Sequence, residues 1–534
     1  MEGVLRAMEV PEPRVSEAPS SRWICWVVIL LSLPALLPLA GALLIPYLKH
    51  RVPTGFIEYD LPSYLAEGRA YFDRGFHLTY GNPYAGYDSP TIYFQPQTML
   101  LGLLQQAGLE PGVTFNIFGL LALLFAATAA VLFYKEVVGL QTRAKKIGLL
   151  CFFWGGGVFT LVGLMLAVAR RLPFSSVWEF EPTWGWWMLN FGRNLVYPTE
   201  AFYHGIFLLS LLALIRGRLG WSLACAVLLC CSHPFTGLTL ILILIAYSAV
   251  ELALRSGSVN LPFLLAALVI AALHLGYYMI WLNRFTDHRV LQAQWQKAWL
   301  YPPKVFVAAL IFVGCLAIWR LASSRFGCFQ DARNRLFAVW FLVVFALTQH
   351  NLVMRPLQPI HFAHGYDWMA LFFLGAPVLI ALLDSLLRIS SPLKRWSVLA
   401  LLLGVFLLDN AAWLIKIAIH NEFVISLSSN ESDALRWLSR NAKPGDMVVC
   451  QDELVSYLVS TYSPALSWQG HEKNTPFIEQ RREEVERGFS QGQVLQEWKR
   501  SGVVFVAPAA WLPPADLSLQ RRYENSDFAI WESP

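Results

Sequence analysis

The sequence predicts a polytopic α-helical membrane protein with about eleven transmembrane helices and a small C-terminal α/β soluble domain. Of its 534 residues, 56% are hydrophobic and only 14% are charged, whereas soluble globular chains carry about 25% charged residues. Long apolar runs dominate residues 23–420, and residues 428–534 have the composition of an ordinary soluble protein. We therefore expect a membrane domain and then a soluble domain, preceded by a disordered N-terminal segment at residues 1–22.

Eleven apolar runs predict membrane spans, although some are short for a bilayer. The first is too long for the core of a signal peptide and has no small-residue cleavage pattern, so we expect it to be retained. The fifth and sixth runs flank His233 and Pro234, which predicts either a tight hairpin or one broken helix that faces protein or water. The predicted spans are residues 24–48, 113–134, 147–168, 199–215, 219–232, 235–254, 260–282, 304–322, 335–350, 367–387 and 396–418.

Basic connections between the spans predict the orientation of the chain, because basic loops stay on the cytoplasmic side. All of them fall on that side if the N-terminus is cytoplasmic and residues 92–108, which are rich in glutamine, form an interfacial helix that does not cross. The first long loop, residues 49–112, and the C-terminal domain, residues 428–534, are then extracytoplasmic, that is, periplasmic or exterior. The basic connections are residues 135–146, 216–218, 320–335 and 388–395.

The C-terminal domain alternates helix and strand signals, which is typical of a small, partly parallel α/β sheet. Its first predicted strand is not followed by a glycine-rich phosphate loop, so we do not predict a nucleotide-binding domain. The predicted helices are residues 433–441, 476–489 and 493–501, and the predicted strands are residues 447–450, 503–506 and 528–531.

Two acidic residues at the start of the first loop are candidates for catalysis. Glu58 and Asp60 directly follow the first span, and a helix that returns toward the membrane comes next. This order places a carboxylate at the bilayer surface, where it suits a general base for a lipid-borne substrate. Partial desolvation would raise its pKa toward a useful range. The alternative, which the residues alone favour slightly, is a solvated helix start, because Asp is a good helix cap.

The rest of the loop favours the catalytic interpretation of these acidic residues over the helix start. An amphipathic helix follows Asp60, and then come a turn at Asn82–Pro83, the acidic-x-Pro sequence that begins at Asp88, and Tyr93. With the interfacial helix, the second span and the basic cytoplasmic loop, this order resembles the first loop of the GT-C glycosyltransferases. These are integral membrane enzymes that take sugars from polyprenyl or dolichyl phosphate carriers. The nearest resemblance is to the aminoarabinose transferases of lipid A and the protein O-mannosyltransferases. The C-terminal domain is also similar to domains attached to many bacterial members.

The resemblance implies an inverting glycosyltransferase in which Asp60 is the catalytic aspartate and Asp88 is the second acidic residue. The family often has an acidic pair at the first site, whereas here the other acid is Glu58. Asp60 would deprotonate or orient an acceptor, which attacks the anomeric carbon of a lipid-phosphate sugar and displaces the phosphate.

The departing phosphate needs positive partners on the same face. Arg355 and His361 lie in a loop that directly precedes a span, at phosphate depth, and Arg193 is the next candidate. The alternative for each is snorkelling or contact with lipid headgroups. Further accessory candidates share a position in or beside the predicted site and are Glu58, His233, His364 and Tyr93.

We predict no cofactor. Asp60 and Asp88 could hold a divalent cation, but two carboxylates from one loop are too few to predict a metal site. The eight cysteines show no zinc or disulfide spacing. The expected partners are a polyprenyl-phosphate sugar, membrane lipid, and an acceptor that is a lipid, a glycan or a protein. The net charge of +5 gives no reason to expect nucleic acid.

Two other functions remain open on the sequence. A transporter or flippase would use the break at His233 to line a pathway, and a catalytically inactive scaffold would use the C-terminal domain for assembly. Transporters commonly show two related halves, and no such repeat is found in the sequence. They also seldom need a long first loop, so the sequence favours the enzyme.

Overall fold

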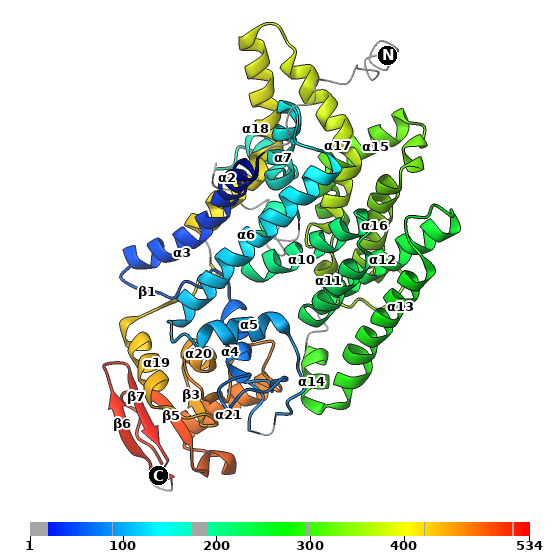
Figure 1. Cartoon of the computed structure of the whole chain (residues 1–534). Helices are drawn as coiled ribbons and strands as arrows, with labels where there is room; N and C mark the ends of the chain where they lie inside the picture. Colours follow the sequence, from blue (N-terminus) through cyan, green and yellow to red (C-terminus); the bar gives the residue numbers. More distant parts are fainter. Residues whose placement is uncertain are drawn as a thin grey trace.

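The computed structural model describes residues 20–87, 89–173, 175, 189–294, 299–420, 422–514 and 517–533. A long bundle of helices forms most of the molecule (Figure 1). The C-terminal strands and the first loop lie together at one end of this bundle, and the connection between α17 (Tyr366–Leu387) and α18 (Pro392–Ile419) lies at the opposite end (Figure 1). The predicted fold class is therefore confirmed in its two parts, a helical membrane region and a small sheet-containing C-terminal region.

Each of the eleven predicted spans coincides with one helix or with two or three consecutive helical segments. In the described residues, eight helices are long and apolar enough to cross a membrane, and a bent pair would make nine. The helices at the predicted spans are α2 (Ser21–Ser32) with η1 (Leu33–Leu36) and α3 (Leu37–Leu48), α6 (Pro111–Val137), α7 (Arg143–Trp154) with α8 (Phe159–Arg170), α10 (Pro198–Ile215), α11 (Leu219–Ser232), α12 (Pro234–Ala253), α13 (Leu261–Leu275) with η4 (Gly276–Trp281) and η5 (Leu282–Arg284), α15 (Pro303–Ser323), α16 (Ala332–Thr348), α17 (Tyr366–Leu387) and α18 (Pro392–Ile419).

The starts of these helices follow from local chemistry. The side chains of Thr142, Asn260 and Ser391 accept hydrogen bonds from backbone N–H groups two or three residues into α7, α13 and α18. Pro111 and Pro198 occupy the first turns of α6 and α10. Proline suits that position because the first backbone N–H groups of a helix have no partner within the helix.

The third predicted span, residues 147–168, is made of two helices with a sharp bend between them. Helices α7 and α8 meet at 71° across a run of glycines. The backbone N–H of Gly156 donates to the carbonyl of Phe406 at 3.0 Å. A Cβ on Gly157 would lie 2.3 Å from the carbonyl oxygen of Ala308. The break is thus held inside the protein, where other helices satisfy its backbone.

The first loop folds back over the ends of the membrane helices. It contains β1 (Val52–Pro53), α4 (Leu61–Ala70) and α5 (Pro96–Gln105). Helix α5 has ten residues, which is too short to cross a bilayer that needs about 20. Gly68 and Gly102 bring α4 and α5 together, because a Cβ on Gly102 would lie 1.9 Å from the carbonyl oxygen of Gly68.

The C-terminal region is a mixed five-stranded sheet with helices around it. The strand order is β4-β3-β5-β7-β6; β3 pairs in parallel with β4 and β5, and β7 is antiparallel to β5 and β6. Helix α20 and strands β4 and β6 were not predicted, and the expected helix at residues 493–501 is only the short turn η9 (Gln496–Lys499). The elements are β2 (Ser426–Leu427), α19 (Ser429–Asn441), β3 (Met447–Cys450), α20 (Glu453–Tyr462), β4 (Leu466–Ser467), α21 (Ile478–Gln491), β5 (Val503–Pro508), β6 (Gln520–Glu524) and β7 (Phe528–Glu532).

The described chain also contains short connecting elements between the spans. Four of them are single turns that follow or precede a span, and the longest, α14, lies beside the first loop (Figure 1). These elements are α9 (Phe191–Asn194), α14 (Thr286–Gln294), η6 (Gly327–Gln330), η7 (His350–Leu352) and η8 (Pro359–Phe362).

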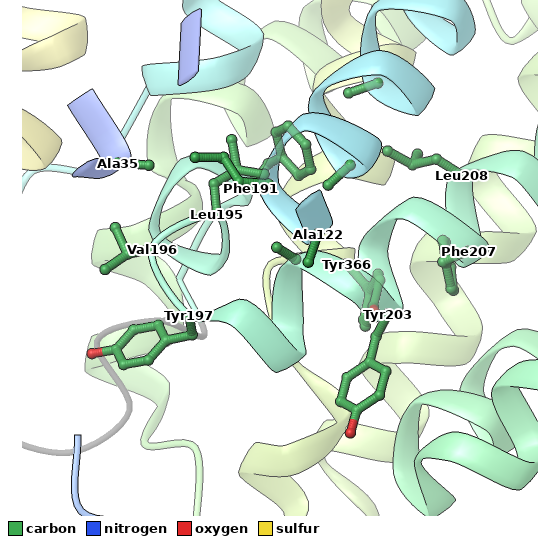
Figure 2. Packing of buried hydrophobic residues seen from close by; sticks show 14 of the residues in the cluster. Ala35, Ala122, Phe191, Leu195, Val196, Tyr197, Tyr203, Phe207, Leu208 and Tyr366 are labelled. Carbon is green, nitrogen blue, oxygen red and sulfur yellow. The ribbon is translucent and has the colours of Figure 1, made fainter. Parts of the chain in front are cut away.

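One hydrophobic core joins the membrane helices, the first loop and part of the C-terminal region. Within it, Phe207 of α10 stacks on Tyr366 of α17 with ring centroids 4.2 Å apart, and Tyr203 lies one turn away (Figure 2). At the other boundary, β1 pairs with β2, and the hydroxyl of Tyr457 on α20 donates to the carbonyl of Tyr59. The C-terminal region is therefore packed directly onto the first loop.

Candidate active site

Asp60 lies at the position that precedes the first turn of α4. In the described chain its carboxylate makes no capping hydrogen bond to that helix and reaches the C-terminal region instead. One oxygen, Oδ1, lies 2.7 Å from Nε2 of His471, and the other, Oδ2, lies 3.7 Å from Nζ of Lys473. The Asp60 side chain is 35% exposed. The carboxylate is therefore positioned by the fold and remains accessible, rather than serving as a helix cap.

His471 holds the Asp60 carboxylate by a hydrogen bond, and its other contacts define the tautomer of its ring. Its ring is buried and stacks on Tyr59 with centroids 5.1 Å apart. Its Nδ1 accepts hydrogen bonds from the backbone N–H groups of Lys473 at 3.2 Å and Asn474 at 3.1 Å. The hydrogen-bond pattern thus assigns the ring proton to Nε2, which donates to the Asp60 carboxylate.

Asp60 and Glu58 have opposite pKa shifts. Burial raises the pKa of Glu58 well above its ordinary value, and the negative charge of Asp60 adds to that increase. Burial also acts to raise the pKa of Asp60, but the hydrogen bond from His471 and the charge of Lys473 outweigh it and lower that pKa. The expectation of a raised pKa for Asp60 is therefore wrong, because its hydrogen bond and its positive neighbours outweigh the effect of desolvation. The surroundings therefore favour the charged form of Asp60 and the neutral form of Glu58.

Lys473 connects this carboxylate to the next part of the site. Its Nζ lies 4.7 Å from the ring centroid of Trp299, and that ring lies 5.2 Å from the ring of His361. The Lys473 side chain is 35% exposed. A continuous series of contacts therefore leads from Asp60 to a histidine that the sequence had singled out for phosphate.

Three predicted histidines form one cluster where the membrane helices end. The ring of His364 lies 5.8 Å from that of His361 and 5.7 Å from that of His233. Its Nδ1 lies 2.7 Å from a carboxylate oxygen of Glu200, near the start of α10, and His361 stacks on Phe235 at 5.1 Å. The cluster brings together α10, the α11–α12 junction and the turn before α17.

Arg193 is placed elsewhere, in a buried network that joins helices. Its guanidinium is fully buried, lies 3.0 Å from Asp409 and donates to Asn410 at 2.9 Å. It also lies over the ring of Trp413. Asp409 in turn accepts from the backbone N–H of Thr160 at the start of α8. We therefore correct the prediction of Arg193 as a phosphate ligand, because its charge is already neutralised inside the helical core.

The remaining predicted residues are not part of the described series of contacts that leads from Asp60 to the histidine cluster. Arg355 lies on the loop before η8 with an exposed side chain, and its part in phosphate binding stays a prediction. The hydroxyl of Tyr93 lies 3.2 Å from Nδ1 of His288 on α14. Asp88 falls outside the described residues.

The described residues contain no group of three or more His, Cys, Asp or Glu side chains that could hold a metal ion. Sequence reasoning missed His471 and Lys473, which lie more than 400 positions after Asp60. No periodicity or motif in the sequence links the two segments. The sequence does indicate a functional role for Glu200, because it is an acidic residue at the edge of an apolar span.

The sequence matches no family model and no curated protein. In solved structures, the chain is similar to ArnT from Cupriavidus metallidurans bound to undecaprenyl phosphate, with a TM-score of 0.50 and 12% identity over 97% of this chain and 99% of that one. It is also similar to the Archaeoglobus fulgidus oligosaccharyltransferase in the apo form, with a TM-score of 0.50 and 13% identity over 96% and 75% of the two chains. Both proteins are GT-C superfamily members.

The chain has the GT-C fold. The resemblance noted in the first loop is therefore matched by the arrangement of almost the whole chain, including the C-terminal region. At 12% and 13% identity the likeness concerns the fold alone. Within this GT-C fold, Asp60 follows the first membrane helix pair and lies between the C-terminal region and the helix ends.

Proposed function

We propose that the chain is an inverting glycosyltransferase that moves a sugar from a polyprenyl-phosphate donor to an acceptor at the extracytoplasmic membrane face. The observation that carries the proposal is the position of Asp60. Its accessible, ionised carboxylate lies beside Lys473, which leads to the histidine cluster at the ends of the membrane helices. The fold supports the proposal because ArnT, which shares it, was solved with undecaprenyl phosphate bound.

The reaction needs one base and one departing phosphate. In the proposed step, Asp60 accepts the proton of the acceptor nucleophile while that atom bonds to the anomeric carbon of the sugar. The bond from the anomeric carbon to the phosphate oxygen breaks, and its electron pair leaves with the polyprenyl phosphate. Attack opposite the leaving group inverts the anomeric configuration. Positioning both reactants at one surface supplies much of the rate gain.

The phosphate is proposed to meet the histidine cluster. His361 and His364 lie in the first residues of the candidate span Pro359–Leu387, and we expect the start of a span to lie near the depth of the lipid headgroups. Their ring N–H groups are suitable donors to phosphate oxygens. Glu200 is proposed to orient His364, as their contact indicates. His233 supports the same ring from the other side.

Glu58 is proposed to act as a neutral group. Burial and the charge of Asp60 both raise the pKa of Glu58 and so favour its protonated form, which leaves Asp60 as the candidate base. Its Oε2 accepts from the backbone N–H of Asp60 at 2.9 Å, so it helps to position the catalytic carboxylate. Two carboxyl groups whose environments move their pKa values apart are a common arrangement where one of them acts as the base.

The proposal is tested with purified wild-type protein and the Asp60→Asn variant. Each is incubated with a panel of radiolabelled polyprenyl-phosphate sugars, and release of polyprenyl phosphate is measured. We expect release by the wild type with at least one donor and a loss of about 100-fold or more in the variant. Asp433→Asn, an exposed acid on α19, is the matched control and should keep full activity. Equal release by Asp60→Asn, or no release with any donor, would contradict the proposal.

A further inference from the structure

We propose that Lys473, a residue of the C-terminal region, binds the phosphate group of the lipid-linked donor. The inference rests on the proposed function and adds a phosphate ligand that the sequence did not predict. It also makes the C-terminal region part of the donor site instead of an accessory domain.

The ammonium group of Lys473 lies between the catalytic carboxylate and the histidine cluster. On one side its Nζ is 3.7 Å from Oδ2 of Asp60. On the other side it lies over Trp299, whose ring is 5.2 Å from that of His361. A donor whose anomeric carbon is attacked beside Asp60 must carry its phosphate one bond further on. We therefore expect the phosphate to lie on the side of Asp60 that faces His361.

The contact with Asp60 is loose enough to exchange. At 3.7 Å the ion pair is longer than a charge-assisted hydrogen bond, and both side chains are about one-third exposed. Ion pairs between partly exposed side chains contribute little to stability. His471 already supplies a hydrogen bond to the other oxygen at 2.7 Å. Asp60 therefore stays in place when the ammonium group turns toward a phosphate.

The backbone of Lys473 is fixed although its side chain is long. Its N–H donates to His471, and the carbonyl of Asn474 accepts from the side chain of Asn82 in the first loop at 2.6 Å. This anchored turn delivers a flexible four-carbon stem with a charged end to the site. Such a design suits a group that moves between two partners a few ångströms apart.

Donor binding would then prepare the base. While Lys473 is next to Asp60, its charge lowers the pKa of that carboxyl group. When the ammonium group turns to the phosphate, Asp60 loses this positive neighbour and its pKa rises. The carboxylate becomes a stronger base at the moment when the donor is in place, which couples donor binding to activation of the acceptor.

The test measures binding to the full-length protein in nanodiscs, without turnover. The ligands are undecaprenyl phosphate, undecaprenol and inorganic phosphate, and the variants are Lys473→Gln, Lys473→Arg and the control Lys443→Gln, an exposed lysine before β3. We expect Lys473→Gln to weaken undecaprenyl phosphate binding by about tenfold or more, and Lys473→Arg and Lys443→Gln to bind nearly as the wild type does. Undecaprenol binding should be equal in all variants, which also shows that each one is folded.

A double-mutant cycle with Asp60→Asn tests the exchange itself. We expect Asp60→Asn to tighten undecaprenyl phosphate binding in the presence of Lys473, because the ammonium group no longer has a competing carboxylate, and to do so less in the Lys473→Gln background. If Asp60→Asn tightened undecaprenyl phosphate binding equally with and without Lys473, the proposed exchange of the ammonium group between Asp60 and the phosphate would be overturned.

The outcomes separate this inference from the proposed function. Wild-type binding that Lys473→Gln leaves unchanged overturns the inference alone. Wild-type protein that does not bind undecaprenyl phosphate overturns the proposed function and this inference together. Inorganic phosphate that binds as tightly as undecaprenyl phosphate, with the same dependence on Lys473, overturns the assignment to a lipid donor.

Discussion

Asp60 and Glu58 are two residues apart, yet their surroundings shift the pKa values of their carboxyl groups in opposite directions. Asp60 receives a hydrogen bond from His471 and lies near Lys473, which favours its charged form. Glu58 is half-buried beside a charge of the same sign, which favours its neutral form. The lowered pKa keeps Asp60 ionised at neutral and mildly acidic pH, so the residue is ready to accept a proton throughout that range.

His471 should therefore control the acid limb of the pH–rate profile. Replacing it by Leu removes the hydrogen bond that stabilises the Asp60 carboxylate, while burial continues to raise the pKa of that group. We expect the acid limb of kcat/KM for the His471→Leu variant to move to higher pH by about one unit or more. His471→Gln, which keeps an N–H donor, should move it less. The measurement is the pH profile of sugar transfer for the wild type and both variants.

An acid limb that stays at the same pH in His471→Leu would contradict this role for the imidazole. A uniform loss of rate at every pH would indicate that the substitution only disturbs the packing around Tyr59, with which the ring stacks. The His471→Gln variant separates the loss of the hydrogen bond from the loss of packing, because it changes the ring packing but retains an N–H donor.

Single residues of the site differ in how well the sequence could predict them. Asp60 was accessible to prediction because its neighbours along the chain carry the pattern: a span before it and a returning helix after it. His471 and Lys473 were not, because their meaning depends on a contact between segments 411 residues apart. Arg193 was assigned wrongly because an arginine that meets a buried Asp409 and one that meets a phosphate look alike in sequence.

At the scale of elements, hydropathy predicted the helices of the membrane region well. An apolar run needs only its own composition to be recognised, and every predicted span holds a helix. The bend between α7 and α8 was missed because it depends on contacts with α15 and α18. In the C-terminal region, α20 was missed because its apolar residues are mixed with buried Ser and Thr side chains, which weakens the helical pattern.

The packing of α4 on α5 positions the start of the first loop, and glycine makes it possible. A Cβ on Gly102 would lie 1.9 Å from a backbone carbonyl of α4, so Gly102→Ala forces the two helices apart. We expect a loss of stability of about 1–3 kcal/mol and reduced transfer, since α4 carries Asp60 at its start. The measurement is the midpoint of thermal unfolding, combined with the release assay.

Gly404→Ala on α18 is the matched control for that substitution. A Cβ there meets no atom within 4 Å, and alanine favours a helix over glycine by up to about 1 kcal/mol. Its unfolding midpoint should stay unchanged or rise. A Gly102→Ala variant as stable and active as the Gly404→Ala variant would show that the close approach of α4 and α5 is not needed.

At the scale of the whole molecule, the candidate site is made where three parts of the chain meet. The first loop supplies Asp60, the C-terminal region supplies His471 and Lys473, and the ends of the membrane helices supply the histidine cluster. The pairing of β1 with β2 and the hydrogen bond from Tyr457 to the first loop hold the first two parts together. The fold class was predictable from composition, but the union of these parts into one site was not, because it arises only from packing.

The location of the donor tests this account most directly. A photoactivatable undecaprenyl phosphate, with the reactive group next to the phosphate, is bound to the full-length protein in nanodiscs and activated by light. The labelled peptides are then mapped by mass spectrometry. The account predicts labels on the segment around Asp60, on residues 471–474 and on residues 359–366, all lost on competition with unlabelled undecaprenyl phosphate. Labels confined to the opposite end of the bundle, at the α6–α7 and α17–α18 connections, would contradict it.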